Sequence, residues 1–349
     1  MKLEPVRVEP EFAPRIWGAR SLAPLYPEKT NLTEPIGEAW LTGLGCKLAT
    51  GPFAGRDLRA AWETMPPEWR GTRLAAVSEF PILAKFIFPK EKLSIQVHPD
   101  DAFAQRHETA AGGRGKTEMW HVISAEPGAQ LLLGTKPGVS KEAFAEALAA
   151  GTLEEPLQSW PVRPGDTFFV PARTPHTIGG GMILCEIQQY SDVTYRVYDY
   201  GRVDAHGKPR ELHIDKALAV INFGRSAGGR VSALPLRAEG MKRFLLSACR
   251  YFASERWELA SPAATQKHPE HFDVFVILSG RGTFAWDHGA AGYRRGEAWL
   301  IPAALGRLRV TPNELTTLLR TYVPDLDGLE KQLLGEGADP AALSQVVFT

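Results

Sequence analysis

Residues 93–100 of the chain read LSIQVHPD, and their polarity alternates from one residue to the next. Such alternation is the pattern of a half-buried β-strand, in which side chains two positions apart point to the same face. Gln96 and His98 therefore stand side by side, and Pro99 ends the strand because it lacks a backbone N–H. A Q-x-H triplet alone is more typical of a polar sheet face with a hydrogen-bonded histidine, so the rest of the chain must decide between that face and a metal site.

Two further potential ligands follow at the starts of later strands. Glu118 opens the predicted strand 118–124, EMWHVIS, and His176 follows the segment GDTFFVPARTP, which predicts a turn, a buried strand and a second strand entry. Together Gln96, His98, Glu118 and His176 offer two imidazoles, a carboxylate and an amide oxygen. This donor set suits a borderline divalent metal with open positions for water or substrate, which favours a catalytic site.

The composition excludes several classes of function. The 349 residues contain 40 basic and 40 acidic side chains without a basic stripe, so we expect neither nucleic acid nor a membrane surface as a partner. No signal-like or membrane-spanning apolar run is present. Three separated cysteines, Cys46, Cys185 and Cys249, favour reduced thiols and hence the cytoplasm. With 33 glycines and 27 prolines the chain is rich in turns, which favours a β protein.

Small helical segments interrupt the predicted strands. Helical spacing or capping residues place them at about 50–80, 100–110, 140–160 and 213–223. Between two strands, AAGGRGKTE (residues 110–118) resembles a phosphate-binding loop, but no apolar strand precedes it, so we expect no nucleotide there. Lys85 interrupts the apolar run PILAKFIF, where a charge must reach the surface or meet a partner.

The C-terminal region repeats the central one. Residues 275–286 match residues 121–132, and residues 296–307 match residues 165–176, with glycine and proline in corresponding places. We therefore expect a mainly β chain of two β-barrel domains, residues 1–235 with the helical insertions and residues 236–349. This alignment puts Phe272 opposite Glu118 and Arg307 opposite His176, so the second domain lacks the metal ligands. His268 and His271 are expected to be solvated loop residues.

Several motifs in the right order resemble a known family. The segment GDTFFVPARTPH is similar to the second cupin motif, and KLSIQVHPDD, GKTEMWHV and EIQQYSDVTYRVYDYGR together resemble type I mannose-6-phosphate isomerases in their shorter bacterial form. The resemblance covers most of residues 10–225 and continues more weakly beyond them. It implies two cupin domains of jelly-roll type and a metal-dependent aldose–ketose isomerase that interconverts mannose 6-phosphate and fructose 6-phosphate through an enediol(ate).

The resemblance also implies roles for individual residues. Gln96, His98, Glu118 and His176 would bind one zinc ion per chain, and Arg196 would be the catalytic arginine. Lys85, Lys116 and Glu186 fall where that family places polar active-site groups. Glu186, inside an apolar strand, fits a general base with a raised pKa or a partner that holds His176, and the sequence does not decide between them.

Two other functions remain as alternatives. A non-catalytic sugar-phosphate-binding cupin would keep the pocket without turnover, and an iron-dependent cupin dioxygenase would also use two histidines and a glutamate. The long spacing between His98 and Glu118 speaks against the dioxygenase. We expect a small sugar phosphate as the partner, and a monomer or weak homodimer.

Overall fold

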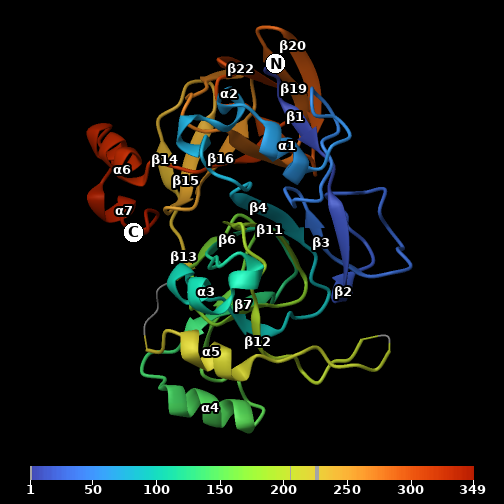
Figure 1. Ribbon diagram of the computed structural model, residues 1–349, viewed down its shortest axis with the longest axis vertical. Helices are drawn as coiled ribbons and strands as arrows, with labels where there is room; N and C mark the ends of the chain where they lie inside the picture. The colour runs from blue at the N-terminus through green and yellow to red at the C-terminus, as the bar shows by residue number, and fades with distance from the viewer. Residues whose placement is uncertain (1, 205, 225–227) are drawn as a thin grey trace.

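The computed structural model describes residues 2–204, 206–224 and 228–349, and its strands form four sheets (Figure 1). Two of them contain the metal-ligand strands predicted above. The larger sheet has the strand order β13 (Gly229–Arg230), β9 (Thr167–Val170), β6 (Glu118–Ala125), β11 (Met182–Gln189), β4 (Ile82–Ile87), β3 (Ile36–Trp40) and β2 (Glu11–Ala19). The smaller has the order β12 (Tyr195–Tyr198), β5 (Ile95–Val97), β10 (His176–Ile178), β7 (Gln130–Thr135) and β8 (Leu157–Pro161).

The other two sheets are built mainly from the C-terminal third. The larger has the order β1 (Val6–Val8), β21 (Ala298–Ile301), β18 (Asp273–Ser279), β23 (Thr316–Tyr322), β16 (Ala253–Leu259), β15 (Lys242–Ala248) and β14 (Leu234–Leu236). The smaller has the order β17 (Ala263–Gln266), β22 (Arg307–Pro312), β19 (Arg281–Trp286) and β20 (Gly289–Arg294). We call the two sheet pairs the first and second repeats.

Each repeat is a sandwich of two open sheets. In the first repeat, Trp120 and Phe168 of the larger sheet share a buried cluster with Leu131 and Ile178 of the smaller one. The mainly β class with small helical insertions is confirmed. The expected β-barrels are corrected in one respect, because the strand pairings of the described residues close none of the sheets on itself, and side chains fill the space between the sheets instead.

Short helices decorate this framework. The predicted segments contain α1 (Leu58–Thr64), α2 (Pro67–Arg70), α3 (Asp101–His107), α4 (Lys141–Ala149) and α5 (Ile214–Val220), with 3₁₀ turns at Thr72–Leu74 and Thr109–Ala111. Two further helices, α6 (Leu326–Gly335) and α7 (Pro340–Leu343), were not predicted and lie beside the second repeat (Figure 1). The segment 140–160 also includes the start of β8 at Leu157. None of the helices in the described residues has the length and apolar character needed to span a membrane.

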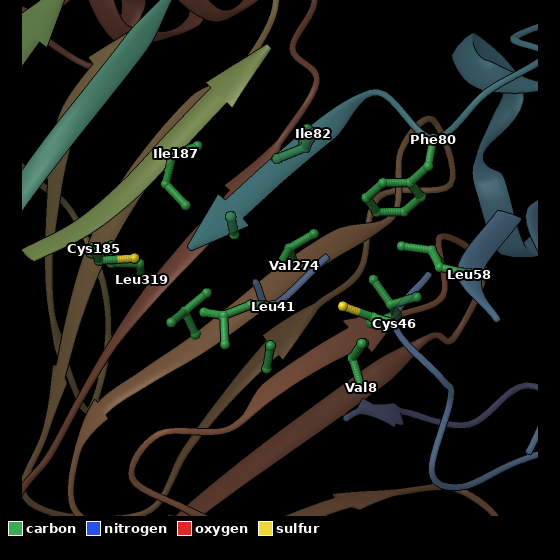
Figure 2. Close-up of a cluster of buried hydrophobic side chains, with 14 of the residues drawn as sticks. Val8, Leu41, Cys46, Leu58, Phe80, Ile82, Cys185, Ile187, Val274 and Leu319 are labelled. Carbon is green, nitrogen blue, oxygen red and sulfur yellow. The ribbon is translucent and has the colours of Figure 1, made fainter. Parts of the chain in front are cut away.

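The two repeats share one buried interface. Ile82 and Ile187 of the first repeat belong to the same apolar cluster as Val274 and Leu319 of the second (Figure 2). The N-terminal strand β1 pairs with β21 of the second repeat before the chain enters β2 of the first. The proposed domain boundary at residue 235 stays a prediction. The chain passes between the repeats twice, first from β1 to β2 and later from β13 to β14.

Candidate metal centre and its cavity

Three of the four predicted ligands converge between the sheets of the first repeat. Ligand atoms of His98, Glu118 and His176 lie within 4.8 Å of one another, and all three residues are buried. His98 Nε2 is 3.2 Å from Glu118 Oε1, and His176 Nε2 is 3.9 Å from Glu118 Oε2. Strand β5 brings His98 to this point directly after Val97, while β6 and β10 begin with Glu118 and His176.

Main-chain carbonyls orient both imidazole rings. His98 Nδ1 lies 2.8 Å from the carbonyl oxygen of Val193, and His176 Nδ1 lies 2.9 Å from that of Thr174. A carbonyl can only accept, so each Nδ1 carries the proton and each Nε2 presents a lone pair to the centre. Such carbonyl partners are typical of metal-binding histidines. Within the described residues, His98 Nε2 has no hydrogen-bond partner, which fits a site built for a cation.

Gln96, the fourth predicted ligand, lies in register with His176 on the neighbouring strand. Its Nε2 is 3.3 Å from His176 Nε2, an arrangement in which the amide donates to the imidazole lone pair. A metal would compete for that same lone pair. Rotating the Gln96 amide by about 180° would turn its oxygen toward the centre, since the two ends of an amide have the same shape. The residue is thus placed to become a ligand after one side-chain rotation.

Burial and neighbouring charges shift the pKa values of these ligands. Burial and the nearby Lys116 lower the pKa of His98 to about 3, so its imidazole is neutral. Burial opposes ionisation of Glu118, but Lys116 and His98 outweigh it and hold the pKa of that carboxyl well below its usual range. Lys116 Nζ lies 2.7 Å from Glu118 Oε1. Two neutral imidazoles and one carboxylate are the protonation states that bind a divalent metal.

A chain of buried charges lies next to this centre. Lys85 Nζ is 3.1 Å from Glu186 Oε1 and 3.6 Å from Glu38 Oε1. Trp120 Nε1 donates to both Glu118 Oε2 and Glu186 Oε2, at 3.0 and 3.1 Å. Burial and the neighbouring Glu118 raise the pKa of Glu186. A lone lysine in an apolar strand usually reaches the surface. Lys85 is buried instead, and its two carboxylate neighbours compensate its charge.

The predicted catalytic residues line one cavity of about 410 Å³. Arg196 enters it from β12, where it pairs with Gln96, and its Nη1 donates to the carbonyl of Glu211 at 2.8 Å. Within the described part of the chain Arg196 makes no ion pair, and its buried Nε has no hydrogen-bond partner. A guanidinium without an ion pair is available to an anionic ligand.

Sequence reasoning missed part of the cavity wall. The missed lining residues that carry charge or can hydrogen-bond include Arg15, Glu38, Ser94, Asp192, Arg210 and His213. Only Glu38 had a usable signal, because a buried Lys85 requires a counter-charge and Glu38 is the single acid of strand β3. Of the two roles that the sequence left open for Glu186, the one as partner of His176 is taken by the Thr174 carbonyl, and Glu186 lines the cavity instead.

Strand pairing corrects the alignment of the two repeats. Glu118 pairs with Val170, and Asp273 pairs with Ile301; both partners directly precede a proline. Asp273 is therefore the equivalent of Glu118, and the sequence alignment that put Phe272 there is wrong by one residue. The second repeat keeps a buried carboxylate at this position.

The histidine position shifts in the same way. His176 pairs with Gln96, whereas the buried Leu308 pairs with Thr265. Arg307 is exposed and points to the opposite face, so Leu308 occupies the place of His176. The residue that the sequence alignment placed opposite His176 is therefore replaced by Leu308.

A lysine takes the place of the remaining histidine. Lys267 follows Thr265 as His98 follows Gln96, and its buried Nζ contacts Asp273 Oδ2. His271 is also buried, with Nδ1 3.2 Å from Asp273 Oδ1, so its expected exposure was wrong. His268 is exposed, as expected. In the second repeat a side-chain ammonium thus supplies the positive charge beside the carboxylate.

The neighbouring ion pair is present in both repeats with its charges exchanged. Glu186 pairs in register with Lys85, and Arg320 pairs in register with Glu255. The Arg320–Glu255 pair spans 3.0 Å, close to the 3.1 Å of the Lys85–Glu186 pair. Among the described residues the metal-type cluster of the first repeat is the only group of its kind. The corresponding interior of the second repeat contains buried ion pairs, which we call its ionic core.

Comparisons with known proteins agree with this geometry. The chain is 33% identical over 317 residues to the mannose-6-phosphate isomerase ManA of Bacillus subtilis, which covers 89% of this chain and 96% of the relative. It is 33% identical over 303 residues to the mannose-6-phosphate isomerase of Streptococcus mutans, covering 86% and 92%. The crystal structure of the B. subtilis mannose 6-phosphate isomerase superposes with a TM-score of 0.82 at 29% identity, covering 91% of this chain and 99% of that one. No family model matches the chain.

Proposed function

The chain belongs to the mannose-6-phosphate isomerase family, and on that basis we propose how its own residues serve the reaction. It is an isomerase of mannose 6-phosphate and fructose 6-phosphate. The reaction moves a proton between C1 and C2 of the sugar through an enediol(ate), so the enzyme must hold a proton acceptor and stabilise negative charge on oxygen. The alternatives, a sugar-phosphate-binding protein and a dioxygenase, are not supported.

The observation that carries the proposal is the convergence of His98, Glu118 and His176, with both Nε2 atoms facing one centre. We propose that these residues, joined by Gln96, bind one zinc ion per chain. Two imidazole nitrogens, a carboxylate and an amide oxygen are borderline donors that suit zinc. When bound, the metal would act as a Lewis acid that stabilises negative charge developing on the sugar oxygens.

The proton is proposed to move at Glu186. Its carboxylate lines the cavity, and burial raises its pKa, which brings a carboxylate closer to the basicity that carbon-bound protons require. Lys85 supports it: burial opposes its charge, but Glu186 and Glu38 raise its pKa, so the ammonium stays protonated. Lys85 would therefore hold and orient the Glu186 carboxylate at 3.1 Å.

Arg196 and Lys116 are proposed to act on charge. Arg196, free of carboxylate partners within the described residues, would bind the developing oxyanion. Lys116 holds Glu118 ionised and reaches the same cavity, so it would orient this ligand beside the substrate. We propose a cytoplasmic location as well, because the three buried cysteines are all free thiols.

One experiment tests the metal site and the reaction together. Purified protein is analysed for bound metals and assayed for conversion of mannose 6-phosphate into fructose 6-phosphate, beside His98→Ala and His176→Ala. We expect about one zinc per native chain, and loss of both metal and activity in each variant, because an open site with one fewer imidazole binds metal poorly. An active variant without bound metal would contradict the site. Oxygen consumption measured in parallel should remain at background.

A further inference from the structure

The loop that precedes Glu118 is held against the end of strand β5. Lys116 N donates to the carbonyl of Pro99 at 3.0 Å, and Gly115 N donates to Asp101 Oδ1 at 2.9 Å. A Cβ on Gly115 would lie 2.6 Å from the main chain of residues 100–101, so only glycine allows this close approach. The position of the Lys116 backbone therefore depends on Asp101.

Asp101 is a junction between the two repeats. Its Oδ1 accepts from Gly115 N and from Gln189 Nε2, the latter at 2.7 Å. Its Oδ2 accepts from Tyr251 OH at 2.5 Å and from Arg250 Nη2 at 2.7 Å. Hydrogen bonds to an ionised carboxylate are stronger than neutral ones, and four donors fix the carboxylate in one orientation.

Two of these donors come from the second repeat. Arg250 and Tyr251 lie in the turn between β15 and β16, and the Tyr251 ring packs against the apolar cluster shared by the repeats. The Tyr251 hydroxyl is part-buried in this contact, whereas the Arg250 side chain is 67% exposed. Tyr251 is therefore the better-anchored donor, since an exposed arginine contributes little to an ion pair in water.

We propose that Tyr251 and Asp101 are positioning residues for the isomerase reaction. Through the chain of hydrogen bonds from Tyr251 to Asp101 to Gly115, the second repeat holds the loop that places Lys116 beside Glu118. The proposal rests on the active-site role given above to Lys116. It also gives the second repeat, which has no metal-type cluster among its described residues, a direct part in the reaction of the first.

The size of the effect follows from the distances. Lys116 Nζ is 2.7 Å from Glu118, and this contact depends on a loop whose main chain is anchored at Pro99 and Asp101. Displacements of about 1 Å in an active site can lower rates by up to about 100-fold. Loss of one of four donors to Asp101 should move the loop less than that, so we expect kcat to fall about 3- to 10-fold.

The test compares Tyr251→Phe with Tyr293→Phe. Both remove a phenol hydroxyl from the second repeat, but that of Tyr293 bonds to Thr316 at 3.0 Å, inside the second repeat. For each metal-loaded variant we measure kcat and KM for mannose 6-phosphate, metal per chain, and hydrogen exchange of the Gly115 amide. Tyr251→Phe should lower kcat about 3- to 10-fold with KM within about twofold, retain the metal, and speed Gly115 exchange. Tyr293→Phe should change none of these.

Unchanged Gly115 exchange in Tyr251→Phe would overturn the proposal, as would faster exchange with native kcat. If Tyr251→Phe fails to fold, Asp101→Asn, which keeps the shape but not the charge, takes its place under the same criteria. Lys116→Met separates this inference from the proposed function: near-native kcat in that variant would remove Lys116 from the mechanism, while Gly115 exchange still reports on Tyr251. If Tyr251 acts through Lys116, the double variant Tyr251→Phe/Lys116→Met should have the same kcat as Lys116→Met alone. If Tyr251→Phe lowers kcat as much in the Lys116→Met background as in the native protein, coupling through Lys116 is refuted.

Discussion

At the level of single residues, the candidate centre is defined by which atom of each side chain is left free. The carbonyls of Val193 and Thr174 engage the Nδ1 atoms of His98 and His176, so both Nε2 lone pairs face the candidate centre. Neither carbonyl could be identified from the sequence, since any residue type supplies one. The residue types of the ligands were predictable from alternation and spacing, whereas the groups that orient them depend on the folded main chain.

The first prediction concerns Arg196. Arg196→Ala should retain the metal, because Arg196 is not among the clustered ligands, but should lower kcat by about 100- to 1000-fold through loss of a charge partner for the oxyanion. Metal analysis and steady-state kinetics check this. The control is Arg230→Ala, which removes an arginine paired with Asp166 at 3.3 Å outside the cavity. Near-native turnover in Arg196→Ala would exclude the proposed role.

At the level of elements, strand β6 carries the candidate ligand Glu118 and, three residues later, the buried histidine His121. His121 faces away from the centre, with its Nδ1 2.9 Å from Thr167 Oγ1, and burial followed by the charge of Arg256 lowers its pKa to about 3. An unfolded histidine titrates near 6.5. Below pH 6.5 the unfolded chain therefore binds a proton that the folded chain does not, and stability falls as the pH falls toward about 3.

The second prediction uses this difference. His121→Gln keeps a polar group beside Thr167 but cannot be protonated. Between pH 7.5 and 5.0 its unfolding free energy should fall by about 2 kcal/mol less than that of the native protein, at about 1.4 kcal/mol per pH unit below 6.5. Urea unfolding at both pH values measures it, with the exposed His288 changed to glutamine as the matched control. Parallel pH dependences of the native protein and His121→Gln would contradict the assignment.

The third prediction concerns strand β23 of the second repeat. Arg320 lies 3.0 Å from Glu255 and 3.1 Å from Asp273, both buried. Arg320→Met removes the counter-charge that these two carboxylates share, leaving Asp273 with Lys267 and Glu255 with Arg243, and should cost about 3–5 kcal/mol of unfolding free energy. Urea unfolding measures the loss. Arg281→Met, which removes an exposed pair with Glu314, should cost at most about 1 kcal/mol, and equal effects would argue against an ionic core.

The repeated elements also explain where sequence alignment failed. The matching motifs identified the repeat, but the exact partners depend on the strand register, which one added or lost residue between two matched motifs shifts. Such a shift moves every side chain to the other face of the sheet. Phe272 and Arg307 were therefore aligned with the ligand positions, although Asp273 and Leu308 face the interior. The ionic core of the second repeat could be identified only from the strand pairing in the structure.

At the level of the whole molecule, the repeats depend on each other. The apolar faces of both larger sheets meet in one cluster, in which Ile82 and Ile187 accompany Val274 and Leu319 (Figure 2). Strand β1 begins the chain in the sheet of the second repeat. The sequence predicted two repeats from their motifs, but it carried no signal for this exchange, because a three-residue strand such as β1 has no period to detect.

The last prediction follows from that interface. A chain ending at residue 235 would keep all four proposed ligands but lose the strands that cover the outer face of β4 and β11, and β1 would lose its partner β21. Each fully buried valine, leucine or isoleucine contributes about 1.5–3 kcal/mol. The free energy lost when this whole face is uncovered should therefore exceed the stability of an ordinary domain, about 5–15 kcal/mol. We expect the truncated chain to aggregate or to lack cooperative unfolding, as judged by size-exclusion chromatography and thermal melting. Co-expression with residues 236–349 is the control, because it restores the covering strands without restoring the chain connection. A monomeric, cooperatively unfolding and active 1–235 fragment would show that the first repeat is self-sufficient, and would remove the second from both its structural and its catalytic part.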